Sequence, residues 1–330
     1  MLLTISVENA GRRLDKFLFS YLNAAPVSFV YKMLRKKRIK LNASRAHGNE
    51  TLAEGDVLRF YLADDTIKGF RKDVFAREAK PMPEIVFEDE NLLIANKPAG
   101  LASHGGMEGK SDHLLARLLF YVQEKGEYPP DADFAPGICN RLDINTSGLI
   151  VCGKNLKTLQ TFNAMFRERK IKKEYLTIVE GIAGYVDETK ILENFFAKDE
   201  NARMAKIKKN PANASANEER GLHGKKGIKA MANNSLEVIT KYTVLATSKT
   251  HSYLLVEPIT GRFHQIRAHL AYAGFPLAGD KKYGGKPTQY ARNQLLHCHR
   301  LIAHELELNL QAPPPENFAR CIKDWFGGIF

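Results

Sequence analysis

Asp143 is the residue of this sequence with the best position for chemistry. It lies in the segment R-L-D-I-N-T-S-G at 141–148, directly before the run L-I-V-C at 149–152, which is typical of a buried strand. A carboxylate at the edge of a sheet, close to Arg141, can stay ionised and act as a nucleophile or a base. The structural alternative is a local Arg141–Asp143 ion pair in a turn capped by Thr146 and Ser147, and these residues alone favour neither interpretation.

Four segments resemble, in their order along the chain, motifs of the RluA-type RNA pseudouridine synthases. They are N-K-P-A-G-L at 96–101, R-L-D-I-N-T-S-G-L at 141–149, K-K-E-Y-L at 172–176 and G-R-F-H-Q-I-R-A-H-L at 261–270. The segment L-A-G-D-K-K-Y-G at 277–284 also resembles this family. One short motif would be a weak indication, whereas four in family order are a specific one.

The resemblance implies an enzyme that isomerises uridine in RNA, with Asp143 as its catalytic residue and no cofactor. It also implies that Arg267 supplies the cation that keeps this carboxylate ionised. Tyr175 would receive the base that is flipped out of the RNA and help to deprotonate its carbon 5, and Arg141 would fill the vacated place. Without the resemblance, a lone tyrosine in a strand is an ordinary core residue.

Three positions qualify this reading. Lys97 resembles the family's first motif, which supports the wall of the active site, although a plain strand-ending turn explains it equally well. Asn140 stands where the family commonly has histidine, and Phe263 stands where it has threonine or serine. These two departures would alter RNA contacts or the support of the aspartate rather than the reaction.

The composition indicates a globular protein with an anionic partner. The chain has 330 residues, of which 44% are hydrophobic, and its 49 Lys and Arg against 37 Asp and Glu give a net charge of +12. This charge favours nucleic acid or an anionic membrane face as the partner. No apolar run has the length of a membrane span, and the N-terminus lacks the pattern of a signal peptide, so we expect a soluble, cytoplasmic protein.

The cysteines show no pattern of disulfides or of metal binding. Cys139, Cys152, Cys298 and Cys321 have no paired spacing, so we expect free thiols. The tripeptide H-C-H at 297–299 suggests zinc, but adjacent residues on one element point in different directions and no second ligand pair accompanies them. We therefore expect no metal site.

The N-terminal residues 1–64 resemble the alpha-L (S4-like) RNA-binding domain. The similar segments are R-L-D-K-F-L at 13–18, S-F-V-Y-K-M-L-R-K at 28–36, I-K-L-N at 39–42 and L-A-E-G-D-V-L at 52–58. We expect two amphipathic helices, the second capped by Ser28, with glycine replaced by Lys37 or Arg38 at the left-handed residue that ends it, at a cost of about 1 kcal/mol. The cations expected to follow a phosphate backbone, rather than merely form a solvated face, are Lys32, Arg35, Lys36, Lys37, Arg38 and Lys40.

The remainder is expected to be a linker, 65–83, and a catalytic domain, 84–330. The resemblance implies an α+β fold with a mixed, mainly antiparallel central sheet and flanking helices. The segment 207–234 lacks apolar periodicity and is expected to be a flexible insertion. Residues 261–273 are expected to form a helix with Phe263, Ile266 and Leu270 facing inward.

Three functions are compatible with these features. The first is an RNA pseudouridine synthase of the RluC/RluD-like branch, which acts as a monomer on large-subunit (23S) ribosomal RNA. The second is a non-catalytic RNA-binding ribosome-assembly factor, which would use the same basic surface. The third, a glycoside or nucleoside hydrolase, is disfavoured because Asp143 has no partner carboxylate within its motif.

Overall fold

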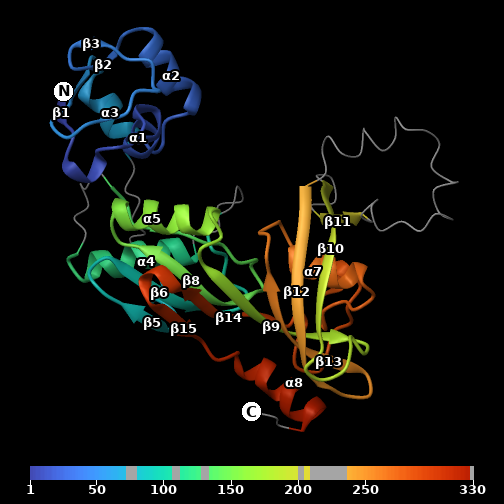
Figure 1. Ribbon diagram of the computed structural model, residues 1–330. Helices are drawn as coiled ribbons and strands as arrows, with labels where there is room; N and C mark the ends of the chain where they lie inside the picture. Colours follow the sequence, from blue (N-terminus) through green and yellow to red (C-terminus); the bar gives the residue numbers. More distant parts are fainter. Residues whose placement is uncertain (72–79, 106–111, 128–133, 200–203, 209–235, 328–330) are drawn as a thin grey trace, which may run out of the picture. The chain divides into compact units, whose positions relative to one another are not determined.

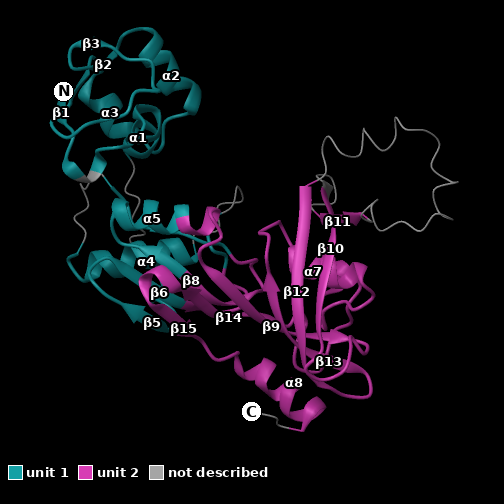
Figure 2. Cartoon of the chain, viewed as in Figure 1, with its two compact units in different colours: residues 1–95, 102–141, 151–164 teal, residues 96–101, 142–150, 165–330 magenta. Residues whose placement is uncertain are grey.

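The computed structural model describes residues 1–71, 80–105, 112–127, 134–199, 204–208 and 236–327 (Figure 1). The chain forms two compact units (Figure 2). Unit 1 comprises residues 1–95, 102–141 and 151–164, and unit 2 comprises residues 96–101, 142–150 and 165–330. This division does not coincide with the predicted boundaries at 64 and 84. The predicted insertion lies outside the described residues except for Ile207 and Lys208.

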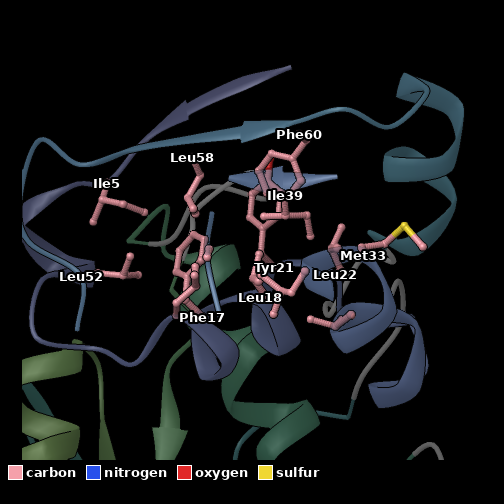
Figure 3. Packing of buried hydrophobic residues seen from close by; sticks show 14 of the residues in the cluster. Ile5, Phe17, Leu18, Tyr21, Leu22, Met33, Ile39, Leu52, Leu58 and Phe60 are labelled. Atoms are coloured by element: carbon pink, nitrogen blue, oxygen red, sulfur yellow. The ribbon is translucent and has the colours of Figure 1, made fainter. Parts of the chain in front are cut away.

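The first 70 residues of unit 1 enclose a hydrophobic core of their own (Figure 3). Phe17 stacks on Tyr21, and Tyr21 stacks on Phe60, with 5.7 Å between ring centroids in both pairs. The four strands form an antiparallel sheet in the order β1-β4-β2-β3. The elements are β1 (Leu2–Thr4), η1 (Val7–Asn9), α1 (Leu14–Tyr21), α2 (Val27–Arg35), β2 (Ile39–Leu41), β3 (Ser44–Arg45), β4 (Val57–Phe60) and α3 (Asp64–Phe70).

Helix α2 ends as predicted but begins earlier. Its first residue is Val27, and Pro26 occupies the N-cap position, so the prediction that Ser28 caps this helix is wrong. At the other end Lys37 is left-handed, with φ of 58°. The N–H of Arg38 donates to the carbonyl of Met33 at 2.9 Å, which is the closing bond of a glycine-type helix end formed here without glycine.

Helix α3 lies where the sequence predicted a linker. Ile67 is buried in the N-terminal core, and Phe70 packs on Phe29 with 4.6 Å between ring centroids. The prediction of a linker over 65–83 is therefore wrong for residues 65–70. The helix is short and buries only one face, so its sequence of mixed charges lacks the apolar periodicity from which a helix is predicted.

The rest of unit 1 contains the antiparallel pairs β5–β6 and β7–β8 and two helices. A cluster of opposite charges lies here, in which Lys154 Nζ contacts Glu88 at 2.6 Å and Glu127 at 2.9 Å. The elements are β5 (Ile85–Glu88), β6 (Leu92–Lys97), α4 (Leu114–Glu124), β7 (Gly137–Ile138), β8 (Ser147–Gly153) and α5 (Leu156–Arg167); the last residues of β6 and α5 and the first of β8 belong to unit 2.

Unit 2 is built on a sheet with the strand order β11-β10-β12-β13-β9-β14-β8, and β15 pairs with β14. Every pair is antiparallel except β14–β8, which is parallel, so the predicted mixed, mainly antiparallel sheet is confirmed. The strands are β9 (Lys172–Glu180), β10 (Thr189–Asp199), β11 (Met204–Lys208), β12 (Leu236–Thr247), β13 (His251–Pro258), β14 (Leu296–Ala303) and β15 (Leu308–Gln311).

Among its described residues, unit 2 also contains two helices after β13 and two short 3-10 turns. Phe318, Cys321 and Ile322 of the C-terminal helix are buried in one cluster with residues of β9 and β13. The helical elements are α7 (Gln265–Tyr272), η4 (Lys281–Tyr283), η5 (His304–Leu306) and α8 (Glu316–Phe326). Within the described ranges, no helix combines the length and the apolar character that crossing a membrane requires.

Gly148 permits the parallel contact between β8 and β14. Its φ is +114°, and a Cβ atom at this position would lie 2.3 Å from the carbonyl oxygen of Cys298. Cys298 is the register partner of Gly148. Any side chain here would therefore push apart the two strands nearest to Asp143.

We expect Gly148→Ala to lower the free energy of unfolding by about 3 kcal/mol, because the added methyl group meets backbone that cannot move aside and the left-handed φ adds strain. Gly274→Ala is the matched control, since its φ is +92° but nothing lies within 4 Å of the added Cβ. That variant should lose only about 1 kcal/mol. Urea unfolding followed by the fluorescence of Trp325, the single tryptophan, measures both, and equal losses would contradict the close contact.

Candidate active site

Asp143 and Arg267 meet in unit 2 although they are far apart in the sequence. Arg267 Nη1 donates to Asp143 Oδ2 at 2.9 Å, from the first turn of α7 to the loop before β8. The Arg267 side chain is 8% exposed and that of Asp143 is 25% exposed. The predicted tertiary ion pair is therefore present, and its carboxylate keeps access to solvent. The alternative ion pair with Arg141 is not among the ion pairs formed by the described residues.

A second carboxylate, which the sequence analysis missed, fixes the arginine. Arg267 Nε donates to Asp280 Oδ2 at 2.7 Å, and Arg267 Nη2 donates to Asp280 Oδ1 at 2.9 Å. The Asp280 side chain is 1% exposed. Burial alone would lower the pKa of Arg267, but the bonds to Asp280 and Asp143 outweigh it and raise this pKa. The only sequence signal was an acidic residue directly after the apolar L-A-G at 277–279.

His264 approaches the same carboxylate as a neutral imidazole. Its Nε2 lies 3.6 Å from Asp143 Oδ2, and burial lowers the pKa of His264 to about 4 against the pull of the Asp143 charge. The Tyr283 hydroxyl accepts the N–H of Ala205 at 2.8 Å and forms a hydrogen bond with His264 Nδ1 at 2.9 Å. The negative Asp143 oxygen that faces Nε2 favours the tautomer with its proton on Nε2, in which Nδ1 accepts the Tyr283 hydroxyl.

The helix that carries Arg267 is shorter than predicted. His264 has a left-handed φ of 51°, so α7 begins at Gln265 and the predicted start at Gly261 is wrong. Ile266 and Leu270 are buried as predicted. Phe263 is 44% exposed, so the prediction that it faces inward is wrong. The left-handed turn at His264 breaks the helical spacing on which that prediction depended.

Tyr175 is a largely buried residue of β9, 8% exposed, opposite Cys298 of β14. Burial, followed by the Cys298 thiol and the negative charge of Asp143, raises the pKa of Tyr175 well above its ordinary value. The phenol is therefore neutral at ordinary pH. Its position within the influence of Asp143 agrees with the predicted grouping of these two residues, while its role stays a prediction.

Lys97 supports the loop that carries Asp143. Its side chain is fully buried, and its Nζ donates to the carbonyls of Pro98 at 2.9 Å, Leu101 at 2.8 Å and Ile144 at 3.2 Å. Burial lowers the pKa of Lys97 to about 7, against the pull of Asp143. Three carbonyl acceptors match the three donors of an ammonium group. Lys97 therefore ties the segment after β6 to the residue next to Asp143.

The predicted RNA-binding cations lie mostly at the surface. Lys40 is half-buried, and its Nζ lies 5.4 Å from the ring centroid of Tyr61. Asn140, the departure beside Arg141, accepts the N–H of Val151 at 2.8 Å and so has a structural role. The exposed cations are Lys32, Arg35, Lys36, Lys37, Arg38 and Arg141.

Strand pairing adds two cations that the sequence analysis missed. Lys40 on β2 lies directly opposite Arg45 on β3 and directly opposite Arg59 on β4. Arg45 and Arg59 are exposed. Like charges at directly opposed positions destabilise a sheet, so this cation row, Arg45–Lys40–Arg59, gains from an anionic partner. The signal for it was the pairing register, which the sequence alone did not give.

The H-C-H segment has structural hydrogen bonds. His297 Nε2 donates to the carbonyl of Ala312 at 3.0 Å, so its Nδ1 accepts the Ser147 hydroxyl at 2.9 Å. His299 also contacts the Ala312 carbonyl, at 2.8 Å. Of the residues that the structure describes, no three His, Cys, Asp or Glu form a group that could hold a metal ion. All four cysteines are free thiols.

Comparison with known proteins agrees with this fold. Residues 91–272 match the family model described as RNA pseudouridylate synthase. The chain belongs to this family, and it is an RNA pseudouridine synthase by sequence and fold. Its fold is shared by human RNA pseudouridylate synthase domain containing 4, with a TM-score of 0.53, 22% identity and coverage of 72% of this chain and 91% of that structure.

Bacterial relatives match over nearly the whole chain. The ribosomal large subunit pseudouridine synthase C of Pasteurella multocida is 30% identical over 314 residues, which cover 94% of this chain and 86% of the relative. The protein of the same name from Rickettsia bellii is 29% identical, with 97% of this chain and 100% of the relative covered. The similarity therefore extends through the N-terminal part as well.

We expect Asp280→Asn to lower kcat for pseudouridine formation on the order of 10²-fold, because a guanidinium that loses its bidentate partner no longer holds Asp143 in one position. KM should change little, since neither Asp280 nor Arg267 is required to dock the RNA. Glu305→Gln, which removes an exposed ion pair with Lys170 in the same unit, is the control and should retain full activity. Unchanged kcat in a folded Asp280→Asn enzyme would show that the aspartate–arginine pair needs no second carboxylate.

Proposed function

We propose that this chain converts uridines of large-subunit ribosomal RNA to pseudouridine, with Asp143 as the catalytic carboxylate. The observation that supports this most directly is the Asp143–Arg267 pair, in which a buried arginine fixed by Asp280 presents one N–H to a carboxylate that is 25% exposed. The names of the bacterial relatives support the choice of RNA. A single chain supplies Asp143, Tyr175 and Arg267, so the proposal includes action as a monomer, and we place it in the cytoplasm.

The reaction requires only groups that this site contains. The bond between the uracil ring and the ribose breaks, the ring turns, and a new bond forms through its carbon 5, which finally loses its proton. Nothing is oxidised or added. An ionised carboxylate can serve as a nucleophile or as a base on the sugar, and Arg267 places a positive charge beside it at 2.9 Å.

A uridine within folded RNA must leave the base stack before it reaches Asp143, which costs a few kcal/mol. An aromatic face returns about 1–3 kcal/mol. We assign the stacking of the flipped base to Tyr175, whose phenol is neutral and close enough to Asp143 for that negative charge to contribute, after burial, to its raised pKa. We assign the filling of the vacated place to Arg141, because its side chain is exposed and a planar guanidinium both stacks and binds phosphate.

The N-terminal residues are assigned to RNA docking. Tyr61, which is 42% exposed, contacts two members of the cation row Arg45–Lys40–Arg59: Lys40 Nζ lies 5.4 Å from its ring centroid, and Arg59 forms a hydrogen bond with it. Positive charge beside an exposed ring is the combination that holds a single RNA strand. We also assign to RNA docking the exposed cations at the end of α2, which lie from Lys32 to Arg38 and precede Lys40 in the sequence.

The test of the catalytic assignment is Asp143→Asn, which keeps the size of the side chain and removes its charge. We expect turnover to vanish while RNA binding is retained, since no proposed docking residue changes. Release of tritium from transcripts of large-subunit ribosomal RNA labelled at carbon 5 of uridine measures the reaction, and filter binding measures affinity. Wild-type protein that binds the transcript without releasing tritium would favour the non-catalytic assembly factor instead.

The docking assignment is tested by replacing Lys40, Arg45 and Arg59 together with glutamine. The slope of log affinity against log salt should become shallower by about 2 to 3, because each lost phosphate contact removes about 0.7 to 0.9. The rate at saturating RNA should be unchanged. Lys68→Gln removes an exposed cation of α3 outside the row and serves as the control. An unaltered slope in the triple variant would remove the row from the RNA interface.

A further inference from the structure

Phe263 is an exposed ring in a fixed position near Asp143. It is 44% exposed, and it stacks on His264 with 3.7 Å between ring centroids and 20° between ring planes. His264 Nε2 in turn lies 3.6 Å from Asp143 Oδ2. Phe263 is the outer of the two stacked rings, since the His264 side chain is only 10% exposed.

The loop that carries this ring is held by hydrogen bonds on both sides. Gln265 Oε1 accepts the N–H of Arg262 at 2.9 Å and the hydroxyl of Thr260 at 2.8 Å. On the other side, His264 adopts its left-handed backbone with its ring bonded to the Tyr283 hydroxyl. The face of Phe263 is thus set before any ligand arrives, so a ligand that stacks on it has no loop to order.

The surroundings of the ring suit RNA. Arg262 precedes Phe263 in the chain, and the positive charge of Lys282 contributes to the lowered pKa of His264. Single exposed apolar residues are common on protein surfaces and need no function. Phe263 differs from those because it stacks on His264, which itself contacts the carboxylate, and because it follows a cation in the chain. A flat apolar face among cations is what a nucleobase with its phosphate requires.

We propose that Phe263 stacks on the base of a nucleotide that neighbours the target uridine, and so helps to select which uridine reaches Asp143. This inference rests on the function proposed above. The neighbour, rather than the target, is the partner because the target base is assigned to Tyr175, and because His264, and not Phe263, contacts the carboxylate. Phe263 is thereby a specificity-determining residue.

The test starts by mapping the uridine that the wild-type enzyme modifies in a transcript of large-subunit ribosomal RNA. A short RNA around that uridine is then made in three forms: intact, with an abasic ribose on its 5′ side, and with an abasic ribose on its 3′ side. KM and kcat are measured on each form for the wild type, Phe263→Ala and Phe263→Tyr. Tyr272→Ala is the matched control, since it removes a ring of α7 that is 49% exposed.

On intact RNA, Phe263→Ala should raise KM about 5- to 150-fold with a smaller effect on kcat, which is the range expected for the loss of one base–aromatic stack. Phe263→Tyr and Tyr272→Ala should stay near the wild-type value. On one of the two abasic RNAs the wild type and Phe263→Ala should have the same KM, because the partner of the ring is gone. This convergence is a readout that a merely structural role of Phe263 would not produce.

An unchanged KM of Phe263→Ala on intact RNA would overturn the inference. So would a loss that persists undiminished on both abasic RNAs, since the ring would then act without a neighbouring base. A wild-type enzyme that forms no pseudouridine in the transcript would instead overturn the proposed function, and this result is obtained before any variant is compared. The two failures are therefore distinguishable.

Discussion

The arginine at position 267 is shared by two carboxylates, and the geometry of the candidate site depends on this division. Asp280 takes two of its N–H donors in a fully buried bidentate contact, and Asp143 receives the third from a side chain that remains partly exposed. A single buried arginine without Asp280 would be costly to desolvate. With Asp280 it becomes a fixed donor whose direction is determined before substrate binds, which is the condition for electrostatic support of a reacting group.

The surrounding structure keeps Asp143 at this donor. Lys97 binds the carbonyl of Ile144, next to Asp143, and Gly148 lets β8 approach β14 directly behind the same loop. Tyr283 forms a hydrogen bond with Nδ1 of His264, and Nε2 of the same ring faces the carboxylate. Each of these contacts joins segments that are distant along the chain. The site is therefore a property of the folded sheet of unit 2 and not of any single motif.

The sequence predicted the Asp143–Arg267 pair but not the second carboxylate that fixes it. Asp143 and Arg267 were paired because their motifs resemble a family, and the mainly antiparallel sheet followed from the same resemblance. The role of Asp280 was missed because this residue lies in the turn between α7 and η4. Hydrophobic periodicity does not predict that this turn brings Asp280 to Arg267. Phe263 was placed inward because helical spacing was extended past His264, whose left-handed backbone is unusual for a residue other than glycine. Arg45 and Arg59 join Lys40 only through strand register, and α3 was concealed by its charges.

The cation row of the N-terminal sheet has a consequence for how the protein is stabilised. Three positive side chains held side by side on adjacent strands repel one another. This repulsion lowers the stability of the small sheet. A polyanion that occupies the row relieves that cost, and by mass action any ligand that binds only the folded form shifts the folding equilibrium toward it. Ribosomal RNA would then act as a folding ligand for this part of the enzyme, whose melting temperature would depend on ionic strength when RNA is absent.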